Sequence, residues 1–219
     1  MGRLNEIKAI NSQLWCPFKT VLFPISFIEL ADSLEKKGYE MSPALPFPRL
    51  PGRLTAIGEI ARKGKTVVQV DTSAQMLNIT DISVKSAVDC FDEIANILAE
   101  DHGFNLDELV KFYRFNATYE IPTEKQAYET IAKNLKIPIL ENLKENWAVE
   151  LWPLELKFAN ANLKANSENW LDISVRPSYE RNDSYVISTV YRNTDKAKTL
   201  KFVETFEENV IKMIELIDR

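Results

Sequence analysis

Apolar and polar residues alternate more regularly in residues 111–121, KFYRFNATYEI, than anywhere else in the chain. Side chains of an extended strand point alternately to its two faces, so one face of this segment is apolar and the other is polar. The apolar positions are Tyr113, Phe115, Ala117, Tyr119 and Ile121, and the polar ones are Arg114, Asn116, Thr118 and Glu120. The pattern predicts a strand with one buried face.

Two capping boxes predict helices that directly follow strands. Ser26 precedes Glu29 by three residues, and apolar residues at helical spacing follow. Thr123 precedes Gln126 in the same way. The first box follows residues 19–23, KTVLF, which we predict to be a strand, and the second follows the alternating segment. Strand, proline, capping box and amphipathic helix therefore occur twice in the same order.

Each half of the chain then continues with three predicted strands and a further helix. In the first half these are strands 54–61, 66–71 and 75–80 and a helix capped by Asp81 or Ser83. In the second half they are strands within 147–158, 170–179 and 185–192 and a helix capped by Thr194 or Asp195. We predict an α+β fold of two β-α-β-β-β-α pseudo-repeats, residues 1–104 and 105–219, in one continuous globular unit.

Helices that cover only one face of an antiparallel sheet leave the other face to polar side chains. We therefore predict antiparallel sheets with helices on one face and a shared polar surface on the other. The residues predicted to bind a ligand there are Gln69, Asp71, Arg114, Asn116, Asp172, Ser174, Arg176 and Arg192.

The duplicated strand–helix–meander–helix unit resembles the TATA-binding-protein-like fold, in which two halves join their sheets into a curved saddle backed by helices. Residues 101–121 and 185–217 are also similar to segments of an uncharacterised prokaryotic family with this architecture, in which a strand ending near an aromatic–Arg pair, here Tyr191–Arg192, runs into the final helix. This likeness implies a fold and no activity. TATA-binding proteins press a basic saddle with inserted phenylalanines into the minor groove, whereas the predicted surface mixes acids with arginines and offers no wedge aromatic beyond Phe112.

Charge and composition narrow the classes of function. The formal net charge of -5 disfavours a surface that attracts polyphosphate throughout, so nucleic acid is a less favoured partner. Cys16 and Cys90 form no metal or disulfide pattern, and no apolar run reaches the length of a membrane span. We predict a cytoplasmic protein without metal or cofactor.

Three short motifs have structural explanations. Residues 64–66 end like a phosphate-binding loop, but Glu59 stands where that pattern requires glycine, so a hairpin turn is predicted. His102 is the single histidine and stands beside Gly103 at a predicted helix end. The acids Asp89, Asp92 and Glu93 are predicted to form a solvated helix face.

Three tryptophans fall on or beside strands of the second half, namely Trp147, Trp152 and Trp170, and we assign them to the core. Trp152–Pro153 indicates that this strand breaks, bulges or lies at a sheet edge, and an uncovered edge could pair with a second chain.

These features favour a non-catalytic module that binds a small ligand or a protein on the polar face, with a homodimer as one form of assembly. A nucleic-acid-binding protein is the alternative. An enzyme with a carboxylate or Tyr–Arg site between the halves is the second alternative, and we rank it last because no nucleophile–base pair is legible.

Overall fold

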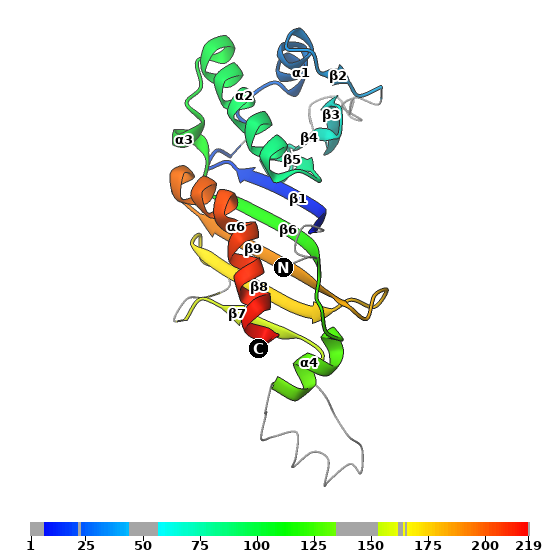
Figure 1. Ribbon diagram of the computed structural model, residues 1–219. Coiled ribbons are helices and arrows are strands. Elements are labelled where there is room, and N and C mark those ends of the chain that lie inside the picture. The colour runs from blue at the N-terminus through cyan, green and yellow to red at the C-terminus, as the bar shows by residue number, and fades with distance from the viewer. Residues whose placement is uncertain are drawn as a thin grey trace.

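The computed structural model describes residues 7–21, 23–43, 57–134, 153–161, 164 and 166–218. In these residues nine strands form one antiparallel sheet accompanied by five helices (Figure 1), which confirms the predicted α+β class. The strands are β1 (Lys8–Pro17), β2 (Glu40–Met41), β3 (Ile57–Lys63), β4 (Thr66–Asp71), β5 (Met76–Asp81), β6 (Tyr113–Pro122), β7 (Leu156–Ala159), β8 (Trp170–Pro177) and β9 (Ser184–Asn193). The helices are α1 (Phe27–Lys36), α2 (Val84–His102), α3 (Leu106–Leu109), α4 (Ala127–Asn134) and α6 (Lys196–Ile217).

The strand order is β2-β3-β4-β5-β1-β6-β9-β8-β7, and every neighbouring pair is antiparallel. β1 and β6, which are far apart in the sequence, therefore lie side by side in the middle of the sheet (Figure 1). From this pair the order runs β5, β4, β3, β2 on one side and β9, β8, β7 on the other. The sheet is open, because its two outermost described strands are not paired with each other.

The helices pack on one face of the sheet, as the sequence predicts. α2 contacts β1, β4 and β5, and α6 contacts β6 and β9, so both run across the front of the sheet in Figure 1. Val68 and Val70 on β4 are 0% and 2% exposed on the side of α2, whereas Gln69 between them is half-buried on the opposite face. No described helix is both long and apolar enough to span a membrane.

Aromatic rings connect the longest helix to the middle of the sheet. The ring of Phe206 on α6 is 5.8 Å from that of Phe115, 5.5 Å from that of Tyr119 and 5.5 Å from that of Phe202, measured between centroids. Phe115 and Tyr119 belong to β6 and are 1% exposed, as is Phe206. The apolar face predicted for residues 111–121 is therefore the face that α6 covers.

Helix ends and turns largely follow the predicted chemistry. Ser26 and Ser83 accept hydrogen bonds from backbone N–H groups at the starts of α1 and α2, and Asp195 does so at the start of α6. Gly64, with φ of +62°, forms the turn between β3 and β4, so the phosphate-loop reading of residues 64–66 is excluded by a strand where a helix would have to begin.

The prediction that residues 19–23 form the first strand is wrong. The strand that pairs with β5 and β6 is β1, which precedes that segment. Its alternation is hidden because a polar residue, Ser12, occupies a covered position and a large aromatic residue, Trp15, occupies an uncovered one. Ser12 is 0% exposed and satisfies its hydroxyl by donating to the Asp81 carbonyl oxygen at 2.6 Å.

The second capping box differs from its prediction as well. Thr123 Oγ1 accepts from the backbone N–H of Lys125 at 3.2 Å, not from Gln126, and α4 begins at Ala127. The Thr123 hydroxyl donates to the Asp218 carboxylate, so it ties the end of β6 to the end of α6. Tertiary bonding has replaced the local cap here.

Parts of the predicted elements lie outside the described residues. These parts include residues 54–56 and 147–152, and with them Trp147 and Trp152. β3 and β7 occupy the described remainder of the two predicted strands. β7, which follows Pro153, is the last strand of the described sheet, as the proline predicts.

Replacing Phe206 by alanine should lower the free energy of unfolding by about 3–5 kcal/mol, because it removes a ring at the junction of α6 and β6. Leu216→Ala on the same helix is the control, because Leu216 is 66% exposed, and it should change stability by less than about 0.5 kcal/mol. Chemical denaturation measures both. Similar losses in the two variants would contradict this account of the core.

Candidate functional site

All eight residues predicted to bind a ligand stand on strand positions that face away from the helices. We call these positions, together with the others that share their face, the open face. Gln69 and Asp71 lie on β4, Arg114 and Asn116 on β6, Arg192 on β9, and Asp172, Ser174 and Arg176 on β8. Their register places them on one side of the sheet because directly opposed residues share a face.

One row of directly opposed residues crosses the open face from β4 to β8. We call it the central row, and its members are Gln69, Asn78, Trp15, Arg114, Arg192 and Trp170. All are half-buried except Asn78, which is 7% exposed. With a strand spacing of about 4.8 Å, the row is roughly 24 Å long.

Two arginines lie directly opposite each other in this row. Arg114 on β6 pairs with Arg192 on β9, which brings their Cα atoms within about 5 Å. Burial lowers the pKa of the Arg114 guanidinium and repulsion from Arg192 lowers it further, although an arginine stays charged at any physiological pH. Like charges directly opposed across two strands destabilise a sheet.

Neighbouring side chains hold both guanidinium groups in place. The Arg114 guanidinium carbon is 5.2 Å from the centroid of the Trp15 ring, and its Nε donates to Asn116 Oδ1 at 2.9 Å. The Arg192 guanidinium carbon is 5.8 Å from the centroid of the Phe112 ring. Cation–π contacts of this kind offset part of the repulsion and orient the planar groups.

At the Gln69 end of the central row, the side chains form hydrogen bonds with neighbouring side chains of the same face. Asn78 Nδ2 donates to Gln69 Oε1 at 2.7 Å, and Trp15 Nε1 donates to Gln13 Oε1 at 3.0 Å. Asn78 Oδ1 is buried and accepts no hydrogen bond from the described residues. Its carbonyl is therefore an unused acceptor beside Trp15.

Three of the other predicted residues are engaged in local structure. Asp71 accepts from the backbone N–H groups of Ser73 (3.0 Å) and Ala74 (2.9 Å), which shapes the turn between β4 and β5. Asp172 forms an ion pair with Lys157 at 3.2 Å. The Arg176 guanidinium carbon lies 4.5 Å from the centroid of the Tyr179 ring. The register puts Gln69, Arg114 and Arg192 in the central row, Asn116 and Asp172 in the next row on one side, and Asp71 in the next row on the other side. Ser174 and Arg176 lie in rows further out.

The sequence prediction missed Trp15 and Asn78 and assigned Trp170 to the core. Trp15 was missed with the whole of β1, because residues 12–16 alternate in burial but not in the polarity of their side chains. Trp170 begins β8 directly opposite Arg192, and this register puts it on the open face. Its core assignment is therefore wrong.

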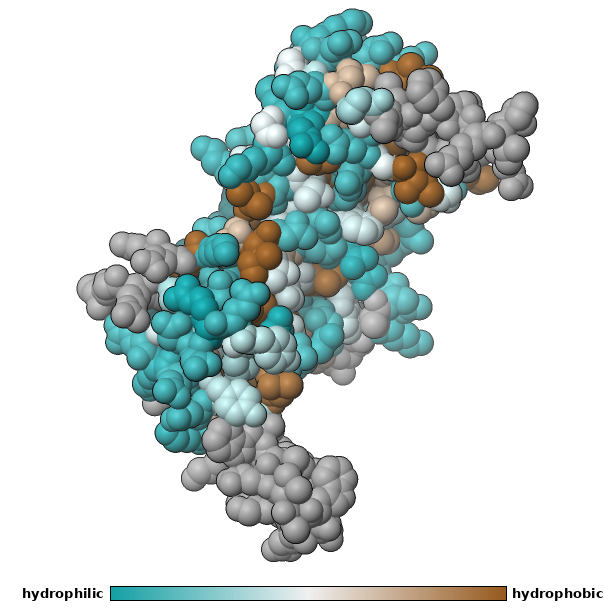
Figure 2. All heavy atoms as spheres, turned by 90° about the vertical axis from the view of Figure 1, so that its right-hand side faces the viewer, coloured by the Kyte–Doolittle hydropathy of each residue, from teal (hydrophilic) through white to brown (hydrophobic). Residues whose placement is uncertain are grey.

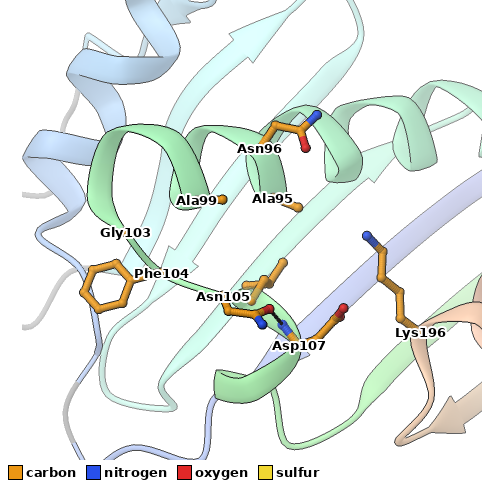
Figure 3. A pocket seen from close by; sticks show the side chains of 9 residues that line it. Ala95, Asn96, Ala99, Gly103, Phe104, Asn105, Asp107 and Lys196 are labelled. Atoms are coloured by element: carbon orange, nitrogen blue, oxygen red, sulfur yellow. Dashed lines mark hydrogen bonds between the residues drawn. The ribbon is translucent and has the colours of Figure 1, made fainter.

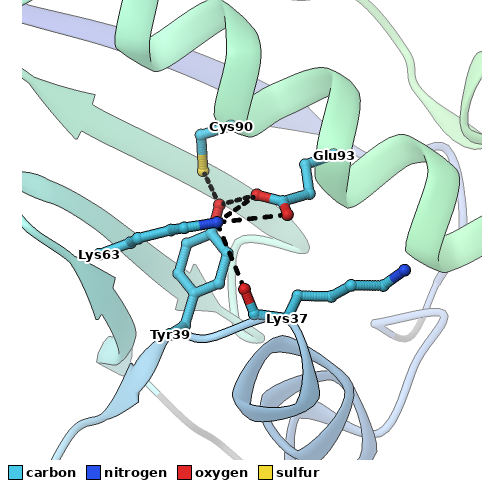
Figure 4. Close-up of polar contacts among 5 residues, drawn as sticks. All are labelled: Lys37, Tyr39, Lys63, Cys90 and Glu93. Atoms are coloured by element: carbon cyan, nitrogen blue, oxygen red, sulfur yellow. Dashed lines mark hydrogen bonds and ion pairs between the residues drawn. The ribbon is translucent and has the colours of Figure 1, made fainter.

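A second cluster of chemically capable side chains lies on the helix side, beside a cavity of about 570 Å³ (Figure 4). The Tyr39 hydroxyl donates to Glu93 Oε2 at 2.7 Å and lies 3.2 Å from Cys90 Sγ. Lys63 Nζ is 3.3 Å from Glu93 Oε2. Burial raises the pKa of the Cys90 thiol to about 11, so it is protonated and a poor nucleophile at neutral pH. The cluster ties α2 to β3. Of the predicted solvated acids, Asp89 is exposed and the Asp92 side chain is 49% exposed, whereas the Glu93 side chain, 32% exposed, is bonded to Tyr39 and Lys63.

A smaller cavity, of about 380 Å³, lies between α2, α3 and the start of α6 (Figure 3). Lys196 at its rim is ion-paired with Asp92 at 3.0 Å. Asp107 accepts a hydrogen bond from the Tyr113 hydroxyl, and its backbone N–H donates to Asn105 Oδ1 at 3.1 Å. These polar groups hold the surrounding elements together and leave no charged group directed at a ligand.

The remaining chemical candidates are structural. His102 ends α2, as predicted, and its Nε2 lies 3.3 Å from Ser33 Oγ. Ser33 is 4% exposed and His102 is half-buried, and the pair links α1 to α2. Tyr191 stacks on Phe202 on the covered side, with centroids 4.0 Å apart, whereas Arg192 faces the open side. The two residues therefore do not form a joint site.

Within the described part of the chain no group of three or more His, Cys, Asp or Glu side chains is arranged to hold a metal ion. Cys16 and Cys90 are free, buried thiols. No protein-family model matches the sequence, and no curated protein is detectably similar to it. The candidate site therefore rests on its geometry.

The free energy of unfolding should fall as the pH rises from about 9 to about 11, because the Cys90 thiol ionises near 9.0 when unfolded and near 11 when folded. This stabilisation is complete below pH 9 and is lost toward the folded pKa. Cys90→Ala removes it, so the variant's stability should fall less steeply, by up to about 1.4 kcal/mol per pH unit. Denaturant unfolding across this range measures the slopes.

Ser86→Ala is the matched control, because Ser86 lines the same cavity and does not titrate. It should keep the wild-type slope. Equal slopes for wild type and Cys90→Ala would show that the thiol titrates alike in both states.

Proposed function

We propose that the protein is a non-catalytic binding module and that the open face is its binding surface. The observation that carries this proposal is the Arg114–Arg192 pair between Trp15 and Trp170 in the central row. Like charges that lie directly opposite each other on neighbouring strands destabilise a sheet. The Arg114–Arg192 opposition is therefore not a pairing that the stability of the sheet favours. Such departures concentrate at functional sites.

The described residues support an enzyme less well. The hollow between α2 and α6, about 550 Å³, is lined by the carboxylates of Asp89, Glu204 and Glu207, which are exposed on helix surfaces. On the other side, β1 and β6 are hydrogen-bonded neighbours, so the sheet has no cleft between the halves. Neither place combines a nucleophile with a base.

An extended nucleic acid is also less well supported. Several other cations on the open face are matched by nearby groups, as Lys157 is by Asp172 and Arg62 is by Glu59. A phosphodiester track needs a string of available cations along its path. The paired cations Lys157 and Arg62 interrupt such a track.

A protein partner could also use the end of the sheet. β7 is a short strand with Phe158 49% exposed, and a second copy pairing there is our proposed form of homodimer. On the side shown in Figure 2, apolar residues form small patches separated by hydrophilic ones, so a broad apolar interface is not favoured on that side.

We propose further that the chain is an internal duplication with a TATA-binding-protein-like arrangement, and that it works in the cytoplasm. The matching strand order on the two sides of the β1–β6 pair supports the duplication. The two free thiols support a reducing compartment.

Native mass spectrometry of gently purified protein should reveal a retained ligand or partner, and phenylglyoxal, which modifies accessible arginines, should then map the contact. We expect protection of Arg114 in the complex, because a molecule on the central row covers its guanidinium. Arg181, exposed between β8 and β9, is the control and should react equally in both states. Protection of Arg181 with none at Arg114 would place the contact elsewhere.

A further inference from the structure

We propose that the hollow between α2 and α6 is a docking groove for an amphipathic helix of a partner protein, one that carries lysine or arginine beside its apolar stripe. The hollow lies on the helix side of the sheet, away from the open face, so this inference goes beyond the proposed function and does not depend on it. The chemistry of the hollow defines the partner: apolar side chains for its floor and positive charges for its rim.

The floor of the hollow is apolar. Val84 and Val88 of α2 and Val203 of α6 line it, and its volume is about 550 Å³. Val203 belongs to the hydrophobic core and the other two valines pack against the core, so the floor is a fixed surface. Val84 and Val88 are one helical turn apart and half-buried, which leaves part of each side chain open to a partner. The volume lies within the range of ligand pockets, roughly 300–1,000 Å³, so whole side chains can enter.

The two helices run in opposite directions along the hollow. Lys196 at the start of α6 is ion-paired with Asp92 of α2 at 3.0 Å, so the helices contact each other there. From this contact the lining residues lie back along α2, at 83–89, and onward along α6, at 203–207, with both helices on the same side of the sheet (Figure 1). Residues 83–89 span about 9 Å, which is enough for nearly two turns of a partner helix.

The walls of the hollow favour a helix over an extended peptide. Both walls are helices, and most of their backbone groups are already bonded within the helix. An extended peptide on the valine floor would leave its own N–H and C=O groups without partners there, whereas a helix satisfies these groups internally. Docking of an amphipathic helix into an apolar groove is an established mode of recognition.

The rim of the hollow is negatively charged. Asp89 of α2 and Glu204 and Glu207 of α6 are exposed carboxylates, and Lys85 is the single cation among the described lining residues. The side chains of Asp89 and Glu204 form no hydrogen bond or ion pair in the described part of the chain. Charges at the rim of an interface select the partner and speed its association. This rim therefore selects a cationic helix.

Other occupants fit the hollow less well. A second copy of this chain would bring a formal net charge of -5 to a rim that is already acidic. A metal ion is not favoured either, because the carboxylates of the described residues form no group arranged to hold one. Only a partner with both an apolar stripe and positive charges complements floor and rim together.

The test uses three synthetic helical peptides of about 18 residues, since shorter isolated helices are marginal in water. The first carries leucine along one face with lysine beside it, the second has glutamate in place of lysine, and the third has serine in place of leucine. We expect the leucine–lysine peptide to bind the full chain and to shift the backbone NMR signals of Val84, Val88 and Val203. The other two should bind about tenfold more weakly or less, because one is repelled by the rim and the other has no apolar side chains for the floor. Fluorescence anisotropy measures the affinities.

Variants of the rim test the charge selection. Glu204→Gln combined with Glu207→Gln should weaken binding of the leucine–lysine peptide about threefold or more, because two exposed ion pairs are lost. Glu204→Lys combined with Glu207→Lys should reverse the preference in favour of the leucine–glutamate peptide. Glu208→Gln combined with Glu215→Gln is the matched control, because it removes two exposed charges of α6 outside the hollow, and it should bind as wild type does. Backbone spectra verify that all variants are folded.

Three results would overturn the inference: no binding of the leucine–lysine peptide at millimolar concentration, equal binding of all three peptides, or an unchanged preference in the double-lysine variant. NMR shifts confined to the strands of the open face would overturn it as well. None of these results bears on the proposed function, because protection of Arg114 from phenylglyoxal tests the opposite side of the sheet.

Discussion

The antiparallel ladder between β1 and β6 is the contact on which the rest of the structure depends. It joins the strands β5, β4 and β3 to the strands β9, β8 and β7 and so makes one sheet from two parts of the chain. Register in such a ladder is strict, since a slip by one residue would turn every side chain to the other face. The same ladder sets Trp15 opposite Arg114, so the candidate site exists only because the two parts are joined in this register.

The helices cover only one face of the sheet, so the two faces are stabilised by different contacts. On the helix side, α2 buries the first part and α6 buries the second, and rings such as Phe206 fill the space between helix and strand. Most of the apolar burial that stabilises the fold is therefore on that side. On the open face, side chains contact one another: the Asn78 amide bonds to Gln69, and the Trp15 ring lies against the Arg114 guanidinium. Asn78 Oδ1 is an exception, because it accepts no hydrogen bond from the described residues. Side chains there are free to serve binding because the core does not depend on them.

The sequence predicts most of the fold because strong local patterns agree with tertiary packing. β6 alternates without interruption, and the serine and aspartate caps stand where α1, α2 and α6 begin. The prediction from sequence fails where hydrogen bonds between residues far apart in the chain override the local pattern. The buried Ser12 is satisfied by a hydrogen bond to a distant carbonyl, and the first N–H of α4, that of Ala127, donates to the distant Asn182 carbonyl oxygen and not to Thr123. The apolar–polar pattern of a single segment does not reveal such long-range contacts.

The sequence predicts which face of the sheet carries the candidate site, but not which residues on that face become neighbours. Alternation assigns Gln69, Arg114 and Arg192 to the polar side of their strands, and the structure agrees. Which residues become neighbours depends on the register between strands, which single strands do not encode. Trp15 and Trp170 join the row for this reason alone.

The Arg114–Arg192 pair is a contact that folding does not favour, and it lies on the surface that we propose for binding. Each arginine taken singly is well placed, because an aromatic ring lies against its guanidinium. Taken together they repel, and a glutamate at either position would turn this repulsion into a cross-strand attraction of about 0.2–1 kcal/mol. Nothing in the backbone of β6 or β9 forbids that exchange, since both positions are regular strand positions with half-buried side chains. The pair is therefore set by the choice of side chains and not by the backbone.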